Sequence, residues 1–364
     1  MEHPENDPIY AGLNVNKGIS QPPPVNPYLK VRKKRRDYSS GEYTEQILKG
    51  NIPVLSQAVT LLESSKKEHQ SVAREIIEKC LPFSGKSIRV GITGVPGAGK
   101  STSIDAFGMY LINQRGRKLA VLAIDPSSER SKGSILGDKT RMEELSRNPH
   151  AFIRPSPTAG SLGGVARKTQ ETIVLCEAAG FDTLFVETVG VGQSETAVHS
   201  MVDFFLLIQL AGTGDELQGI KRGIMEMADG IIVNKADGNN IEKANIAAAQ
   251  YRNALQLFPM PDSGWKPKVL TYSGYYQIGI PEIWEMIDEY ISFTKANGYF
   301  ELRRNSQAKY RMYESINEQL KNHFYQSPLI KKELAIKEIQ VLRSEMTSYQ
   351  AAAQMLALYF NKTD

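Results

Sequence analysis

A glycine-rich loop between a short apolar run and a helical pattern constrains the fold most strongly. The apolar run is IRVGIT (88–93), and the loop after it has the spacing GxxxxGK[ST]. Glycines in such a loop let successive backbone N–H groups turn toward phosphate oxygens, and the dipole of the following helix favours negative charge. The pattern therefore predicts a phosphate-binding loop on the first strand of an α/β domain. The residues expected to contact a nucleotide here are Gly94, Gly97, Ala98, Gly99, Lys100, Ser101 and Thr102.

Two side chains of this loop have separate predicted roles. Lys100 is expected to reach the β- and γ-phosphates of a nucleoside triphosphate, and the Ser101 hydroxyl is expected to coordinate Mg²⁺. A dinucleotide-binding Rossmann loop would need GxGxxG at this place, which the sequence does not contain. An accidental glycine turn is the remaining alternative, and it is disfavoured because a strand pattern precedes the loop and a helical pattern follows it.

Further apolar runs alternate with helical patterns along the chain. Strands that are apolar on both faces are typical of a parallel sheet covered by helices on each side. We therefore predict an α/β fold: a P-loop NTPase-type, mostly parallel sheet with helices on both faces, plus N-terminal and C-terminal helical extensions. The other predicted strands are LAVLAI (119–124), DTLFVE (182–187), DFFLLIQ (203–209), GIIVN (230–234) and KVLTY (268–272). Helices are predicted at 102–114, 165–179, 241–257, 283–294, 305–324 and 336–360, with an earlier helical stretch broken at Asn51-Ile52-Pro53.

The sequence divides into four predicted regions. Residues 1–40 form a proline-rich, basic arm with KVRKKRR at 30–36, for which a solvated tail is favoured over a nucleic-acid patch. Residues 41–86 form a helical region, and 87–296 form the P-loop core. Residues 297–364 form a C-terminal helical extension that is expected to contribute to dimerisation.

Composition narrows the class of protein without indicating a function. The chain has 364 residues, a net charge of +4 and only two cysteines, Cys80 and Cys176. A disulfide scaffold, a cysteine-rich metal site and a nucleic-acid binder are therefore not expected. The first residues have no secretory or mitochondrial pattern, and the longest apolar stretch, 204–211, is far short of the ~20 residues that cross a bilayer. We expect a cytoplasmic protein without a membrane partner.

Specificity for guanine is indicated by an N-K-x-D sequence at the end of the predicted strand GIIVN. The Asp237 carboxylate can accept hydrogen bonds from the ring N–H and the amine of guanine, which adenine does not offer. Asn234 can meet the other edge of the base, and the aliphatic stem of Lys235 can lie along the ring. A buried acceptor left unpaired costs about 1–3 kcal/mol, so adenine should be rejected. Ser273, at a position where many guanine-binding folds have Ser-Ala, is predicted to be a weak further base contact.

Three acids are candidates for Mg²⁺ binding or water positioning together with Ser101. Asp125 follows LAVLAI, Glu187 closes DTLFVE, and Asp138 lies in the segment between them. Doubly wound sheets bind ligands at the carboxyl ends of their strands, so these acids should converge beside the phosphate loop. Helix capping or solvation of each acid is the alternative. No arginine stands out as a transition-state contact, and the weak candidates are Arg154, Arg167 and Arg222.

Several longer stretches between about Gly91 and Val269 resemble one known family. They are GVPGAGKST, LAVLAIDPSS, GSILGDKTRM, RPSPTAGSLGGVA, FVETVGVGQSE, GDELQGIKRGIMEMAD, NKAD and WKPKV. In this order they are similar to the MeaB-type GTPases, the methylmalonyl-CoA mutase-associated chaperones whose human counterpart is the methylmalonic aciduria type A protein. Relatives in this family have also been called lysine/arginine/ornithine transport kinases.

The resemblance implies a homodimeric GTPase of the SIMIBI class that uses Mg²⁺ and converts GTP to GDP. It implies that the chain gates cofactor loading of an adenosylcobalamin-dependent acyl-CoA mutase, with methylmalonyl-CoA mutase favoured, and protects or reactivates it. An adenosyltransferase is a further candidate partner, and cobalamin binding by this chain itself is not implied. The resemblance assigns catalytic and metal roles to Lys100, Ser101, Asp125, Asp138 and Glu187. It assigns a switch or partner relay to Gly190, Gln193, Asp215, Gln218 and Lys221.

Other functions stay open on the sequence. A P-loop kinase would phosphorylate a substrate hydroxyl and would normally lack a guanine-binding N-K-x-D. A GTPase companion of a different cobalamin-dependent acyl-CoA mutase would carry the same motifs as this chain. A nickel-inserting GTPase would need clustered His or Cys ligands, whereas the five histidines here are isolated. A non-enzymatic scaffold would use the nucleotide only for folding.

Overall fold

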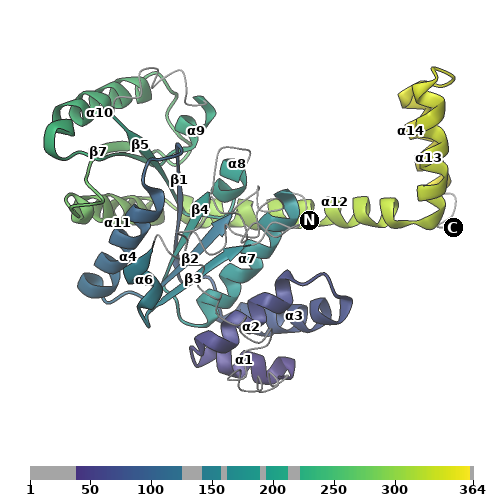
Figure 1. The fold of residues 1–364 in the computed structure, drawn as a ribbon, viewed down its shortest axis with the longest axis horizontal. Helices are drawn as coiled ribbons and strands as arrows, with labels where there is room; N and C mark the ends of the chain where they lie inside the picture. Colours follow the sequence, from purple (N-terminus) through teal and green to yellow (C-terminus); the bar gives the residue numbers. More distant parts are fainter. Residues whose placement is uncertain (1–37, 125–141, 157–161, 189–193, 212–221, 361–364) are drawn as a thin grey trace, which may run out of the picture. The chain divides into compact units, whose positions relative to one another are not determined.

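A parallel β-sheet forms the centre of the computed structural model (Figure 1). The structure describes residues 38–124, 142–156, 162–188, 194–211 and 222–360. Within these ranges the sheet has seven strands in the order β3-β2-β4-β1-β5-β6-β7, and every neighbouring pair is parallel. The predicted α/β fold is confirmed. The strands are β1 (Ile88–Gly94), β2 (Leu119–Ile124), β3 (Ala151–Ser156), β4 (Thr183–Thr188), β5 (Phe204–Leu210), β6 (Gly230–Asn234) and β7 (Lys268–Thr271).

The strand β3 is absent from the sequence prediction. Its sequence, AFIRPS, places Arg154 and Pro155 where a buried strand would continue its apolar run. It lies at an edge of the sheet and pairs with β2. Proline is tolerated on an edge strand because one side of that strand has no ladder partner. The other six strands lie where the apolar runs predicted them, within one residue at each end.

Helices cover both faces of the sheet, and β5 shows how the side chains alternate between them. Leu206 and Ile208 belong to the core formed with the helices of one face, whereas Leu207 belongs to the core on the other face. The first face carries α4 (Lys100–Arg115), α6 (Glu143–Arg147) and α11 (Ile280–Ala296). The second carries α7 (Leu162–Ala178), α8 (Ser194–His199), α9 (Arg222–Met227) and α10 (Ile241–Leu255). Two short 3₁₀ turns are η3 (Leu81–Phe83) and η4 (Gly238–Asn240).

Three helices precede the sheet and pack against α7. They are α1 (Ser40–Leu48), α2 (Ile52–Glu63) and α3 (Lys67–Cys80). The predicted break before Ile52 is confirmed, because the Asn51 side chain accepts a hydrogen bond from the Val54 N–H (3.3 Å) and caps α2. A capping box formed by Ser39 and Glu42 begins α1.

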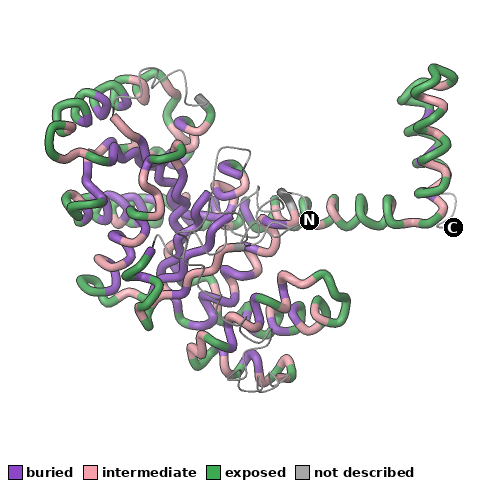
Figure 2. The backbone as a smooth tube through the Cα atoms, viewed as in Figure 1, coloured by how far each residue is buried: buried purple, intermediate pink, exposed green. Residues whose placement is uncertain are grey.

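The C-terminal part of the chain contains three helices, where the sequence indicated two long patterns after α11. They are α12 (Tyr299–Gln326), α13 (Pro328–Leu342) and α14 (Ser348–Phe360). The prediction of continuous helix over 336–360 is wrong, because a turn at 343–347 separates α13 from α14 and Ser344 has a left-handed φ of 58°. The helices α13 and α14 lie side by side, and Figure 2 shows that most residues of both and of the outer half of α12 are exposed or intermediate.

Buried polar side chains tie the first turns of α12 to the sheet. Two arginines of α12 donate to carboxylates that immediately precede β5 and β6, and a glutamine one turn later donates to a backbone carbonyl after α8. The pairs and their donor–acceptor distances are Arg303 Nη1–Asp229 Oδ2 (3.0 Å), Arg304 Nη2–Asp203 Oδ2 (2.7 Å) and Gln307 Nε2–Val202 O (2.8 Å). All three connect positions that are more than 70 residues apart in the sequence.

The structure divides the chain into a compact unit, Ser39–Asp364, and residues 1–38. The four-region division of the sequence stays a prediction. None of the described helices is both long and apolar enough to span a membrane.

Candidate nucleotide site

The loop between β1 and α4 has a backbone that only glycine accommodates at two positions. A Cβ on Gly94 would lie 2.2 Å from the Ile208 carbonyl oxygen of β5. Gly99 has a left-handed φ of 85°, and a Cβ there would lie 2.6 Å from Asn234 Nδ2. The GxxxxGK spacing is therefore required by the close approach of β5 and of β6 as well as by phosphate binding.

Lys100 begins α4 and folds back over the loop. Its ammonium group donates to the Gly94 carbonyl (2.8 Å) and lies 3.4 Å from the Val95 carbonyl. Burial lowers the pKa of Lys100, and the negative charges of Glu187 and Glu195 partly offset this effect. The ammonium group thus lies inside the loop, where phosphate oxygens would replace backbone carbonyls as its partners.

The structure brings together two of the predicted metal ligands. Ser101 Oγ lies 3.4 Å from Glu187 Oε1, and Glu187, at the end of β4, is 3% exposed. A hydroxyl and a carboxylate are oxygen donors of the kind that Mg²⁺ prefers. The described residues contain no group of three or more His, Cys, Asp or Glu that could hold a metal ion. The other two predicted acids, Asp125 and Asp138, lie outside the described residues.

Asn234, at the end of β6, connects the base-binding segment to the phosphate loop. Its Nδ2 donates to the Ala98 carbonyl (2.7 Å), and its Oδ1 accepts from the backbone N–H groups of Lys235 (2.7 Å) and Gly274 (3.0 Å). Lys235 has a left-handed φ of 60°, which is uncommon for a residue with a Cβ and is frequent at binding sites. The side chain of Asn234 is therefore used to hold three backbone segments together.

Ser273, which is predicted to be a weak base contact, orients the Asp237 carboxylate. Ser273 is fully buried, and its Oγ donates to Asp237 Oδ2 at 2.5 Å. The backbone N–H of Tyr276 donates to the same Ser273 Oγ (3.2 Å). The hydroxyl is thus directed to the carboxylate that would bind guanine, and a direct contact of Ser273 with the base stays a prediction.

A second hydrogen-bonded connection between the base-binding segment and the phosphate loop was not predicted from the sequence. The hydroxyls of Tyr272 and Ser103 form a hydrogen bond, and Ser103 Oγ donates to the Gly99 carbonyl (2.7 Å), so Tyr272 is the donor of the pair. Burial raises the pKa of Tyr272, which keeps its phenol neutral and able to donate. Nothing in the sequence distinguishes Tyr272 from the other residues of the predicted strand KVLTY.

The remaining predicted residues are either elsewhere or outside the described part of the chain. Thr102 is exposed in the first turn of α4. Two arginine candidates are engaged in ion pairs, Arg154 with Glu63 of α2 (Nε–Oε1 3.2 Å) and Arg167 with Glu171 (3.4 Å), which disfavours both as contacts to a transition state. The side chain of Arg222 is not described. The predicted switch residues that lie outside the described residues are Gly190, Gln193, Asp215, Gln218 and Lys221.

The glycine loop lies on the central strand of a parallel sheet and is hydrogen-bonded to an N-K-x-D segment two strands away. This arrangement defines the class of P-loop nucleotide-binding proteins with a guanine-type base site. The family model described as "Methylmalonyl Co-A mutase-associated GTPase MeaB" matches residues 55–328. The chain belongs to this MeaB family of P-loop GTPases.

Individual relatives agree with this assignment. A probable GTPase of Mycobacterium tuberculosis is 47% identical over 86% of this chain and 93% of its own length. The GTPase ArgK of Escherichia coli is 46% identical over 78% and 86%, and the mitochondrial methylmalonic aciduria type A homolog of Mus musculus is 44% identical over 86% and 78%. Among solved structures, one described as a LAO/AO transport system kinase matches with a TM-score of 0.71 and 36% identity, covering 88% of this chain and 97% of that one.

Proposed function

We propose that this GTPase is a chaperone for an adenosylcobalamin-dependent acyl-CoA mutase, gating cofactor loading and protecting or reactivating the mutase. The family description names methylmalonyl-CoA mutase, and one relative is named for methylmalonic aciduria, so methylmalonyl-CoA mutase is the first candidate partner. The structural observation that supports guanine-nucleotide chemistry is the hydrogen bond from Asn234 to the Ala98 carbonyl, since it holds the base-binding segment against the phosphate loop.

In this proposal the chain positions GTP and neutralises its charge. Lys100 binds the β- and γ-phosphates, and Ser101 and Glu187 hold Mg²⁺, which supplies further positive charge to the phosphates when bound. Asp125 and Asp138 are proposed as additional acids for metal binding or for orienting water. Binding and positioning dominate because phosphoryl transfer to water needs little covalent chemistry from the protein.

The proposed relay to the partner uses two segments of the sequence, both of which lie outside the described residues. One follows Glu187 directly, and its Gly190 amide would sense the γ-phosphate. The other follows β5. The residues proposed to carry the nucleotide state to the mutase are Gly190, Gln193, Asp215, Gln218 and Lys221.

We further propose that the C-terminal helices form a homodimer contact. The outer half of α12 and both later helices expose large apolar side chains, and contiguous exposed apolar surface is typical of protein interfaces. These side chains include Tyr313, Ile316, Leu320, Ile339, Leu342, Tyr349, Leu356 and Phe360.

The mutase role is tested by measuring GTP hydrolysis with and without a purified acyl-CoA mutase. We expect slow basal turnover that rises when the mutase is added, and co-purification that differs between GDP and a non-hydrolysable GTP analogue. Lys100→Ala should abolish phosphate release, while the matched control Lys118→Ala, an exposed lysine before β2, should not. Equal rates with and without each candidate mutase would contradict the chaperone role and leave the GTPase activity intact.

The base assignment is tested with Asp237→Asn, whose amide can donate to the extra oxygen of xanthine. We expect affinity for GTP to fall by at least about tenfold and affinity for XTP to rise, because the carboxylate no longer accepts two hydrogen bonds. The control is Asp262→Asn, at an aspartate that lies outside the N-K-x-D segment. Unchanged ATP-dependent phosphorylation of a substrate hydroxyl in the variant would instead support the kinase named in the LAO/AO structure.

A further inference from the structure

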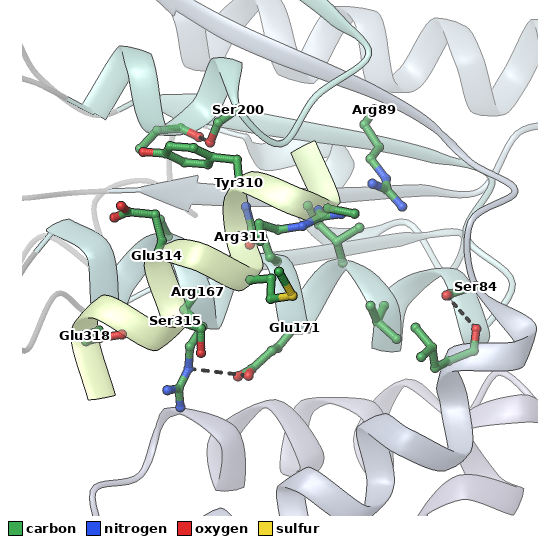
Figure 3. Close-up of a pocket in the computed structure, with 18 of the residues that line it drawn as sticks. Ser84, Arg89, Arg167, Glu171, Ser200, Tyr310, Arg311, Glu314, Ser315 and Glu318 are labelled. Atoms are coloured by element: carbon green, nitrogen blue, oxygen red, sulfur yellow. Dashed lines mark hydrogen bonds and ion pairs between the residues drawn. The ribbon is translucent and has the colours of Figure 1, made fainter. Parts of the chain in front are cut away.

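A cavity of about 530 Å³ lies between α7, α8, α12 and the turn after α3 (Figure 3). None of the residues proposed for nucleotide binding lines it. Its volume lies within the range of about 300–1,000 Å³ that is typical of small-molecule sites. Both its apolar and its charged lining residues come from elements that are far apart in the sequence, so the cavity is formed by the tertiary fold.

One guanidinium in the wall of this cavity lacks an ion pair. Arg89 is bound by Glu177 through two hydrogen bonds (2.9 and 3.1 Å), and Arg304 is bound by Asp203 (2.7 Å). By contrast, the Arg311 guanidinium forms no hydrogen bond or ion pair with the side chains of the described residues. Two of the three neighbouring arginines thus have a carboxylate as a direct partner, and Arg311 does not.

The surroundings of Arg311 make that charge unfavourable without a ligand. Burial lowers the pKa of Arg311, and the positive charges of Arg89 and Arg304 act in the same direction, while Glu177 partly offsets them. Arginine nevertheless stays protonated in proteins. An anion that entered the cavity would therefore gain a charge-assisted hydrogen bond and relieve the repulsion among the three guanidinium groups.

The other walls restrict the kind of anion. The inner surface includes Leu81, Ile173, Val174 and Met312, which favour an apolar body. Figure 3 shows Glu314 and Glu318 on the same helix as Arg311, and Glu171 paired with Arg167 on α7. These carboxylates would repel a ligand with several negative charges, such as a nucleotide or a polyphosphate.

We propose that this cavity binds a small organic monoanion, whose carboxylate or sulfonate pairs with Arg311 and whose apolar body contacts α7 and the turn after α3. The site is separate from the nucleotide site. Its ligand differs from GTP in charge as well as in shape, because the carboxylates on α7 and α12 exclude a polyanion.

The test uses two fluorescent probes with the same kind of aromatic body. 8-Anilinonaphthalene-1-sulfonate carries one negative charge, and N-phenyl-1-naphthylamine carries none. Both are titrated into the full chain saturated with GDP and Mg²⁺, so that the phosphate loop is occupied. We expect the sulfonate to bind at one saturable site per chain and to resist displacement by inorganic pyrophosphate.

Substitutions distinguish the contribution of the Arg311 charge to probe binding from the contribution of the apolar wall of the cavity. Arg311→Gln should weaken sulfonate binding by at least about tenfold and change binding of the neutral probe by less than about twofold. The matched control Arg147→Gln removes an exposed guanidinium at the end of α6 and should change neither. Ala308→Trp, at an exposed position of α12 that lines the cavity, should weaken both probes.

Each contrary result would overturn the proposal. Wild-type sulfonate affinity in Arg311→Gln would show that the charge of Arg311 does not hold the anion. Unchanged binding of both probes in Ala308→Trp would place them elsewhere, for instance on the exposed apolar side chains of the C-terminal helices. Displacement of the sulfonate by pyrophosphate would show that the cavity accepts polyanions. Circular dichroism and thermal unfolding of each variant verify that the fold is retained.

Discussion

The two halves of α12 differ in what holds them. In the first half, Phe300, Arg303 and Gln307 are buried, and the polar side chains are bonded to acids and carbonyls of the sheet domain. In the second half, Ile316 and Leu320 are 44% and 58% exposed, although both are apolar. One continuous helix therefore buries two polar side chains, Arg303 and Gln307, in its first half and exposes apolar side chains in its second half.

This inversion shows that the two halves depend on different partners. The first half is fixed by contacts within the chain, because its guanidinium groups form ion pairs with the buried carboxylates of Asp229 and Asp203. The second half gains stability only if another surface covers its apolar side chains. The C-terminal helices are therefore a single structural extension with two sources of stability. Substitutions in the two halves of α12 should affect these two sources separately.

The largest effect is expected for Arg303→Met, which leaves Asp229 without its guanidinium. The side chains of this pair are 9% and 12% exposed. Removing one partner of such a buried pair typically costs about 3–5 kcal/mol, which urea unfolding would measure. The control Arg343→Met removes an exposed pair with Glu345 (4.0 Å) and should change the free energy of unfolding by at most about 1 kcal/mol. Equal losses in both variants would contradict the difference between the two regions.

A smaller, pH-dependent effect is expected at His199, beside the first half of α12. Burial lowers the pKa of His199 to about 4, with a further contribution from Arg303, and the imidazole packs edge-on against Phe205. The unfolded chain binds more protons at this residue between about pH 6.5 and pH 4, so its contribution is complete above pH 6.5 and is lost as the pH falls toward 4. The loss amounts to at most about 3 kcal/mol.

His199→Gln should remove this part of the pH dependence. The measurement is the free energy of unfolding in urea at several pH values between 4 and 7, compared with wild type. The matched control is His323→Gln, on the exposed second half of α12. If wild type and His199→Gln lose stability in parallel over this range, His199 is not the group responsible.

Substitutions in the second half of α12 are expected to have the smallest effect on the stability of the folded chain. They are expected to change its oligomeric state instead. Ile316 and Leu320 lie one turn apart on the same face, so replacing both by Asp places two charges on the proposed dimer contact. Light scattering after size exclusion should show the mass of a monomer, with little loss of helix content. Asn317→Asp combined with Gln319→Glu adds the same charge without removing apolar side chains and should keep the dimer. A dimer that persists in the first variant would rule out this face as the contact.

Much of the sheet could be predicted because its information is local. A buried parallel strand needs an apolar run, and six of the seven described strands have one. The edge strand β3 was missed since Arg154 and Pro155 interrupt the run, and an edge tolerates both. The turn between α13 and α14 was missed because residues 343–347 contain neither Gly nor Pro, and Ser344 adopts the left-handed conformation instead.

In the candidate site, too, the features set by neighbouring residues could be predicted, and the contacts between residues distant in the sequence could not. The phosphate loop and the N-K-x-D segment are short motifs, so the sequence alone indicated them. The bond from Asn234 to Ala98 and the bond from Ser273 to Asp237 join residues 136 and 36 positions apart, and no spacing rule predicts such pairs. The polar ties of α12 were missed for the same reason.

The ties at the start of α12 also limit how this chain can recombine during evolution. A gene fusion or exchange that joined a new C-terminal segment at residue 297 would remove Arg303 and Arg304 from Asp229 and Asp203. Two buried acids would then have to be replaced at the same time, at sites 70 to 100 codons upstream. Exchange of the helices after Gln307 needs no such compensating change. We therefore expect breakpoints that survive selection to fall inside α12 rather than before it.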